Sequence, residues 1–454
     1  MVFTDIMQRF VDQRPVAVMV RAVLEKQLSE AFFEETFAAL AQEQYTKDLT
    51  FATCARLLAQ VTLGQASSVH AAFVKERQTI PVGISSLYEK LQHVEPLVCE
   101  GLVSRSTAEL TEVVTLLNRR DEPIAGYRLR IVNGNVLGGS EHRLKELRGL
   151  AAAAMPGKTL ILYDYATALI SEMAACEEGQ ASERRLLPQL LTRVRANDLI
   201  MGDRNFATAQ TLTELVKRQA GFLIRHHASL SLTWQGVARP RARCQTGKVY
   251  EQRVRLKCGL VCRAIIIRRD EPLRDGNRKV VLLTNLPTKA GSARTLANLY
   301  LQRWTIEEAF RQLTEYLCCE VSTLGYPKAA LFAFTLAVLA YNCLTCVKTA
   351  LQAAHPKGKH EWSTFHMAWE VKATFDGMMV AVPVEEWQPF ATMSNTALAE
   401  VLRELAGKVD PARYAKRRRG PKKTPERKKV KSRHVSTAKI LQERKLTRTQ
   451  GPRS

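Results

Sequence analysis

Three polar side chains recur at helical spacing between residues 300 and 307. Tyr300, Arg303 and Glu307 are separated by three and four residues, so in a helix they lie on one face, about one turn apart. A carboxylate can ligate Mg²⁺, a guanidinium can bind two phosphate oxygens at once, and a phenol can donate one hydrogen bond. Most clusters of this kind are surface ion pairs. Chemistry at this one depends on where the helix lies.

Two more oxygen-bearing side chains follow predicted strands. A short strand at residues 199–201 ends at Gly202 and Asp203, and an alternating strand at residues 128–132 ends at Asn133. Mg²⁺ prefers hard oxygen ligands, and two such ions about 4 Å apart can hold the attacking and leaving oxygens of a phosphodiester. Strand ends and one helix would have to bring these side chains together.

The order of predicted elements is that of a ribonuclease H-like core, which makes this an α/β chain. Antiparallel-type strands, a helix, the strand ending in Asp203 and a later helix with Glu307 follow one another, and an apolar stripe would dock that helix on the sheet. A strand-rich segment between them is too long for a plain connection and predicts a β insertion. The core strands and helix are expected at residues 128–132, 159–163, 168–170, 182–194 and 199–201.

Composition shifts divide the chain into seven parts. Helices near residues 68–75 and 85–91, with a turn through Pro81 and Gly83, could form a helix-turn-helix, although any small helical bundle has the same pattern. The parts are a helical DNA-binding region (1–95), a helical linker (96–125), the first part of the core (126–220), the β insertion (221–290), the last part of the core with the Glu307 helix (291–349), C-terminal helices (350–410) and a basic disordered tail (411–454).

The tail carries most of the charge. From Pro411 to Ser454 there are 17 basic and 2 acidic residues, a net of +15 out of +23 for the whole chain. Cations that neutralise phosphates release counterions, so this run predicts a nucleic-acid partner, with a solvated tail as the alternative. Its densest part, and the part that we expect to bind DNA, is Lys416, Arg417, Arg418 and Arg419.

Cysteines and hydropathy predict a soluble protein of a reducing compartment. The 10 cysteines are scattered among aliphatic residues, which is typical of core thiols and favours neither a disulfide scaffold nor a zinc site, and we expect the protein to be cytoplasmic. Residues 329–347 are uncharged for long enough to cross a membrane. Thr335, Asn342 and Thr345 interrupt this stretch, so a central buried helix is expected, with no membrane association.

Three segments resemble insertion-sequence transposases of the IS-four group. Residues 300–310 read YLQRWTIEEAF, which resembles the Y-x2-R-x3-E-x6-K signature of that family. Residues 199–206, LIMGDRNF, are similar to its second acidic segment, and residues 131–143, IVNGNVLGGSEHR, line up with its first. The resemblance covers about residues 126–347.

This resemblance implies a DDE-type transposase that cleaves DNA at the inverted ends of a mobile element and transfers the strands to target DNA. Asp203 and Glu307 would ligate Mg²⁺, with Mn²⁺ as a substitute. Asn133 stands at the one remaining ligand position, which belongs to the first segment. Arg303 and Tyr300 would bind phosphates beside the scissile bond, and Trp304 is expected to anchor its helix in the core. Two ends must be joined, so a homodimer in a synaptic complex is expected.

The sequence departs from the family pattern at two positions. Asn133 stands where the first aspartate is usual, and its amide adds no negative charge, so divalent ions would bind less well. Thr314 stands where the signature has lysine; Arg311 shares that face and is our candidate for the missing DNA-binding charge. An impaired transposase and a catalytically inactive, transposase-derived DNA-binding protein both remain open, with an RNA-binding protein as a more distant alternative.

Overall fold

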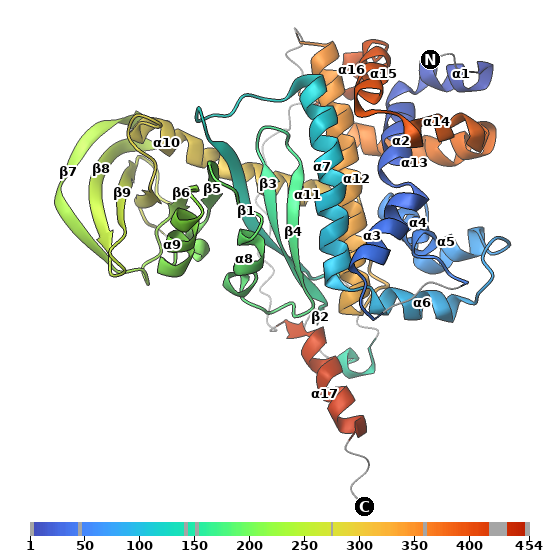
Figure 1. Ribbon diagram of the computed structural model, residues 1–454, viewed down its shortest axis with the longest axis horizontal. Coiled ribbons are helices and arrows are strands. Elements are labelled where there is room, and N and C mark those ends of the chain that lie inside the picture. The colour runs from blue at the N-terminus through green and yellow to red at the C-terminus, as the bar shows by residue number, and fades with distance from the viewer. Residues whose placement is uncertain are drawn as a thin grey trace, which may run out of the picture.

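The computed structural model describes residues 4–43, 48–139, 144–149, 154–273, 276–356, 361–416 and 434–449. A large sheet forms one side of the molecule, and a layer of helices forms the other (Figure 1). Two long helices, α7 (Pro96–Asn118) and α12 (Pro327–Ala354), run side by side between them.

The N-terminal region is helical, as predicted, and packs on α12. Serine or threonine caps the start of four of its helices, because each hydroxyl accepts a hydrogen bond from a backbone amide three residues on. The predicted helix-turn-helix pair corresponds to α5, which packs on α4, and α6, which packs on α12. The helices are α1 (Asp5–Gln13), α2 (Pro15–Gln27), α3 (Glu30–Leu40), α4 (Phe51–Thr62), α5 (Val69–Lys75) and α6 (Ile84–His93).

Nine strands form one mixed sheet in the order β4-β3-β1-β5-β6-β10-β9-β8-β7. The strands predicted at 128–132, 159–163 and 199–201 are present, whereas the strand predicted at 168–170 begins only at Ile170 and runs to Cys176. Strand β1 continues five residues past its predicted end at Val132 and reaches Leu137, so Asn133 lies within a strand. The core strands are β1 (Arg128–Leu137), β3 (Gly157–Asp164), β4 (Ile170–Cys176), β5 (Asp198–Gly202) and β6 (Gly221–Arg225).

The strand-rich insertion extends the same sheet. Its strands join the core through antiparallel pairing of β10 with β6. One strand, β7, was absent from the prediction because its alternation is interrupted by Gly236 and Pro240. The insertion strands are β7 (Leu232–Cys244), β8 (Gly247–Leu256), β9 (Val261–Arg269) and β10 (Lys279–Thr284).

Each face of the sheet has its own apolar core. One face packs on the long helices and on α11 (Trp304–Tyr316), and includes Leu129, Ile131 and Met201. The other face packs on α8 (Glu183–Leu191) and α9 (Ala209–Lys217), and includes Val132 and Ile200. Side chains therefore alternate between two buried surfaces, as expected for a sheet that is covered on both sides.

The predicted helix from residue 292 to 317 is broken into three pieces. Ser292 caps α10 (Ala293–Leu299), the chain tightens into a 3₁₀ turn, η3 (Tyr300–Arg303), and α11 follows. The apolar residues Leu299, Ile306 and Leu313 are nevertheless buried as predicted.

The long apolar stretch is the central helix α12. It is the one helix among the described residues that is long and apolar enough to cross a membrane, and that stretch is completely buried inside the protein. Asn342 is fully buried at the centre of this helix. Its side chain accepts a hydrogen bond from the Ile170 N–H and donates one to the Ile170 carbonyl oxygen, so both of its polar groups are paired.

The C-terminal region is helical, and part of the tail is ordered. Within the described residues, β11 pairs with β2 (Ala154–Met155) and α17 follows it, so the prediction of a disordered tail is wrong there. Isolated charge runs cannot reveal this pairing with a distant strand. The elements are α13 (Thr364–Ala381), α14 (Gln388–Thr392), α15 (Asn395–Gly407), α16 (Pro411–Tyr414), β11 (Val435–Ser436) and α17 (Thr437–Thr449).

Candidate active site

Asn133 and Asp203 are brought to one face at one end of the sheet. Strands β1 and β5 are parallel neighbours with Ile131 opposite Met201, so Asn133 and Asp203 each follow two residues beyond a matched pair. By alternation both side chains lie on the face that carries Ile131 and Met201 and that α11 covers. The Asn133 Oδ1 accepts a hydrogen bond from the backbone N–H of Gly134, at 3.1 Å.

The turn after β5 holds Asp203 in place. Asp203 caps the short 3₁₀ turn η2 (Arg204–Phe206), accepting a hydrogen bond from the Asn205 backbone N–H at 2.8 Å. The Asn205 side chain donates to Glu183 Oε2 at 2.7 Å. Glu183 also packs against Gly134, where a Cβ would overlap its carboxylate. A glutamate at the start of α8 thus links the chain beside Asn133 to the loop beside Asp203.

Tyr300, Arg303 and Glu307 connect that strand end to α11. The Tyr300 hydroxyl donates to the Gly202 carbonyl oxygen at 3.3 Å. Burial raises the pKa of Tyr300 to about 12, with the charge of Asp203 acting in the same direction and that of Arg303 opposing it. Arg303 forms an ion pair with Glu307 at 2.8 Å. Tyr300 therefore contacts the residue before Asp203, and Arg303 contacts Glu307 across the junction of the 3₁₀ turn and α11.

Trp304 does not anchor α11 in the core, so that prediction is wrong. It is 62% exposed, and the Arg303 guanidinium lies over its ring, 5.1 Å from the centroid. The 3₁₀ turn before α11 changes the helical phase, and Ile306 occupies the buried position. An exposed indole beside an arginine at the candidate site is a surface on which a nucleobase can stack.

Two residues near the site were missed by the sequence analysis. Gly202 pairs with Ile224, so Arg225, at the end of β6, follows beside Asp203 on the same face. Its charge also acts on Tyr300. An arginine that ends a strand next to the strand of a candidate metal ligand was a usable signal for Arg225. Glu183 had no such signal, because it follows Ser182 as an ordinary first residue of a capped helix.

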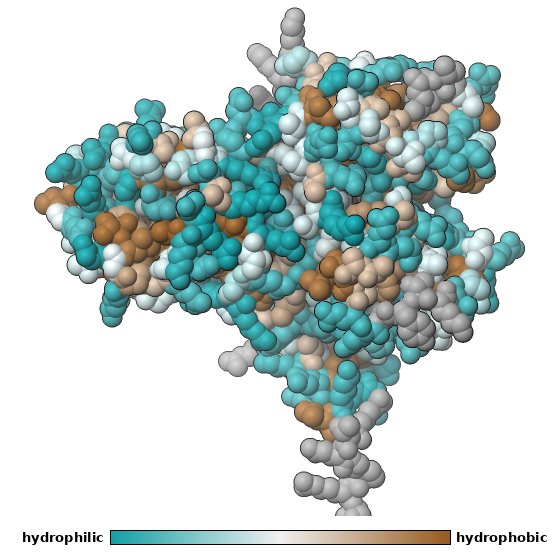
Figure 2. Space-filling view, in the orientation of Figure 1, coloured by the Kyte–Doolittle hydropathy of each residue, from teal (hydrophilic) through white to brown (hydrophobic). Residues whose placement is uncertain are grey.

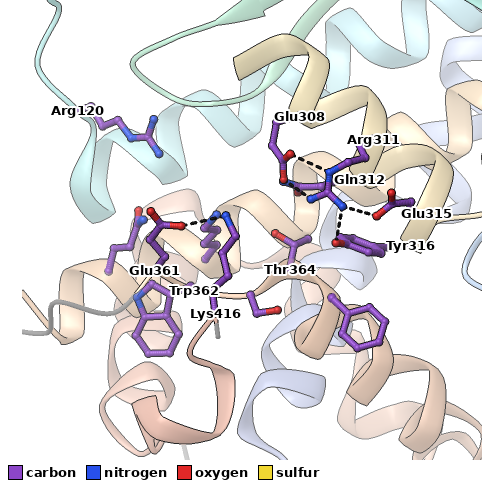
Figure 3. Close-up of a pocket in the computed structure, with 14 residues that line it drawn as sticks. Arg120, Glu308, Arg311, Gln312, Glu315, Tyr316, Glu361, Trp362, Thr364 and Lys416 are labelled. Carbon is purple, nitrogen blue, oxygen red and sulfur yellow. Dashed lines mark hydrogen bonds and ion pairs between the residues drawn. The ribbon is translucent and has the colours of Figure 1, made fainter. Parts of the chain in front are cut away.

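The other predicted DNA-binding residues lie elsewhere. Arg311 pairs with Glu308 and Glu315 on the neighbouring flank of α11 and donates to the Tyr316 hydroxyl at 3.0 Å (Figure 3). Thr314 is exposed, and its hydroxyl donates to the Phe310 carbonyl oxygen. Lys416 pairs with Glu361 at 2.9 Å. The remaining predicted residues, Arg417, Arg418 and Arg419, lie outside the described residues.

The donor set fits a divalent ion in atom type but is poor in charge. Asp203 and Glu307 offer carboxylates and Asn133 an amide oxygen, all of which are hard ligands. Glu307 is paired with Arg303, and the part of the chain that the structure describes contains no group of three or more His, Cys, Asp or Glu residues able to hold a metal. One Mg²⁺ with two anionic ligands is the most that these three side chains can support.

A family model matches the part of the chain that carries Asp203 and Glu307. Residues 153–343 match the transposase DDE domain. This match supports a DDE transposase, and it contains Asp203 and Glu307 but not the strand that carries Asn133. Assignment to the IS-four group stays a prediction.

The other comparisons add little to this match. No curated protein matches the chain. Among solved structures, the chain is similar to a piggyBac transposase in a synaptic complex with hairpin DNA, with a TM-score of 0.40 and 9% sequence identity, over 83% of this chain and 84% of that one.

Proposed function

We propose that the protein is a DNA transposase of the IS-four insertion-sequence group, with Asn133, Asp203 and Glu307 at its catalytic centre. It would cleave DNA at the ends of its element and join the freed 3′ hydroxyls to target DNA. The observation that carries the proposal is the line of contacts from the end of β5 through Tyr300 and Arg303 to Glu307, within a segment that matches a transposase DDE domain.

The roles of the side chains follow from their contacts. Asp203, Glu307 and the Asn133 amide would hold Mg²⁺, or Mn²⁺ in its place, which supplies an activated water and charge stabilisation when bound. Arg303 would leave Glu307 for a phosphate, because a guanidinium binds either partner bidentately. Tyr300 stays protonated at physiological pH, so its hydroxyl can donate to a phosphate oxygen.

DNA binding would extend beyond the catalytic centre. Trp304 offers a stacking surface, Arg225 a phosphate contact beside Asp203, and the basic tail a sequence-independent attraction to DNA. The N-terminal helices would bind the element ends. Two protomers would act together in a cytoplasmic synaptic complex, since two ends must be joined.

A second candidate is a DNA-binding protein that keeps the fold and no longer cuts. It is favoured by Asn133, because only two of the three candidate ligands are acidic. A supercoiled plasmid that carries the genomic DNA flanking the coding sequence separates the candidates. With Mg²⁺ or Mn²⁺, strand breaks support the transposase, whereas retention of the plasmid without breaks supports the binder.

A further inference from the structure

A polar cavity lies beside α11, on the flank that carries Glu308, Arg311 and Glu315. Its volume is about 780 Å³, within the range of small-molecule sites, and it is open to solvent between α11, α12 and the start of α13. Figure 3 shows Glu308, Arg311 and Glu315 along one wall and Glu361 with Lys416 along another. This cavity takes no part in the contacts that join Asp203 to Glu307.

Two of its four cations are neutralised by carboxylates. Arg311 is held by Glu308 and Glu315, and Lys416 is held by Glu361. Arg120 and Lys348 remain: no carboxylate among the described residues lies within ion-pair distance of either side chain. Both line the cavity, and Figure 3 shows Arg120 reaching toward it from the chain after α7 without an acidic partner.

Lys348 lies where its surroundings destabilise its charged form. It belongs to α12, the most buried helix of the protein, and burial lowers its pKa to about 8, with the positive charges of Arg120 and Lys416 as further causes. The charges of Glu361 and Glu308 only partly oppose this effect. Two unpaired cations that repel each other in a half-enclosed cavity are stabilised by a bound anion.

The cavity also offers a helix end and an aromatic surface. The first turn of α13 lines it, and the N-terminal backbone amides of a helix carry partial positive charge. Phe365, in that turn, is 48% exposed and meets Tyr316 edge to face at a centroid distance of 5.5 Å. Tyr316 and Arg120 lie at opposite ends of the cavity (Figure 3), so a ligand that reaches both the Phe365 ring and the cations would need an anion joined to a planar group.

We propose that this cavity binds the phosphate group of a nucleotide, with Lys348 and Arg120 as its charged contacts and Phe365 beside the base. The phosphate belongs either to a free nucleotide or to the 5′ end of a DNA strand, which present the same chemistry. The site does not use Asn133, Asp203 or Glu307. It therefore stands or falls independently of cleavage at the candidate active site.

Calorimetric titration of the full-length protein at pH 7 tests the proposal. The probes are a 5′-phosphorylated trinucleotide, the same trinucleotide with a 5′ hydroxyl, and adenosine monophosphate. We expect the terminal phosphate to strengthen binding at least tenfold. Lys348→Met and Arg120→Gln should each remove that gain, whereas Lys217→Met, an exposed lysine on α9, should keep it. Adenosine monophosphate binding as tightly as the phosphorylated trinucleotide identifies a free nucleotide, and weaker binding identifies a strand end.

Two controls separate a binding role from a structural one. Lys348→Met removes a half-buried charge that has no ion-pair partner among the described residues, so its melting temperature without ligand should equal or exceed that of the unmodified protein. Lys348→Arg should retain phosphate binding, because the guanidinium keeps the charge. Glu307→Gln should abolish cleavage and leave the titration unchanged. Equal binding of the two trinucleotides, or full phosphate binding by Lys348→Met, overturns the proposal.

Discussion

The two flanks of α11 hold their charges in opposite ways. On one flank, Arg303 and Glu307 neutralise each other at 2.8 Å beside the end of β5. On the other, Arg311 and Lys416 are paired, but Lys348 and Arg120 face a cavity with no carboxylate within ion-pair distance among the described residues. In the proposed metal site, one of the three candidate ligands is not acidic. In the cavity, two cations have no anionic partner among the described residues.

The two flanks therefore differ in the charge that each would need from an added group. A site short of one carboxylate should respond most to an added acid. A site with unpaired cations should respond most to an added phosphate. Figure 2 shows that the face in view is mostly hydrophilic, with scattered patches of hydrophobic residues.

The largest expected effect is a gain of cleavage in Asn133→Asp. The added carboxylate would give the divalent ion a third anionic ligand, and we expect plasmid cleavage with Mg²⁺ to rise by roughly 100-fold or more. Asn135→Asp is the matched control, because it adds the same charge two residues further along the same face of β1. Equal rates for the two variants would contradict a metal site at residue 133.

Removing the exposed indole should weaken binding of DNA ends. We expect Trp304→Ala to lose about 1–3 kcal/mol of binding free energy, because a stacked base is worth about that much. The melting temperature should hardly change, since the side chain is largely exposed. Trp369→Ala, another exposed tryptophan, on α13, should bind as before. A large loss of stability in Trp304→Ala would instead restore its role as a core anchor.

Phosphate binding at the cavity should weaken as the pH rises through about 8. Lys348 loses its proton there, while a terminal phosphate, with a second pKa near 6, is already fully ionised. Arg120, Lys416, Glu308, Glu361 and Tyr316 also line the cavity around this lysine. Calorimetry from pH 7 to 9.5 should show a decline of up to about tenfold per unit above pH 8.

Lys348 should also make the stability of the ligand-free protein depend on pH, in a direction that its pKa fixes. Its pKa is lower in the folded protein than the 10.5 of an ordinary lysine, so between about pH 8 and 10.5 the unfolded chain binds more protons. Without ligand, stability should therefore rise with pH in this window relative to Lys348→Met. In Lys348→Arg the pH dependence of phosphate binding should vanish, and a persistent decline would place its origin in another group.

The smallest effect is expected from Arg311→Ala. Because Glu308 and Glu315 already hold this arginine, its loss should leave the salt dependence of DNA-end affinity nearly unchanged. A slope reduced by about one unit would show instead that Arg311 supplies the phosphate contact for which Thr314 has no charge.

Local patterns predicted the elements that carry Asp203 and the Arg303–Glu307 pair, and they did not predict the cavity. Strand ends, helical spacing and an apolar stripe are properties of neighbouring residues, so the positions of Asp203 and the Arg303–Glu307 pair followed from them. Arg120, on the chain just after α7, and Lys348, on α12, are far apart in the sequence, and packing of α7 against α12 brings them to one cavity.

Two predictions failed for different physical reasons. The spacing of residues in an ideal α-helix cannot predict a 3₁₀ turn. The turn η3 places the Trp304 side chain outside the core. A charge run suggests disorder, yet β11 and α17 are held by pairing with β2 and by packing of Ile440 and Leu441 on a small apolar cluster. A contact with a distant segment decided the outcome for the tail, and a local change of helix type decided it for Trp304.

Mn²⁺ binding, followed by electron paramagnetic resonance, tests most directly that residues 133, 203 and 307 form one centre. Three forms of the protein suffice: unmodified, Asn133→Asp, and Asn133→Asp combined with Glu307→Gln. We predict weak binding by the first, binding at least tenfold tighter by the second, and loss of that gain in the third, since coupled ligands are not additive. An affinity that is the same in all three forms would contradict the shared centre.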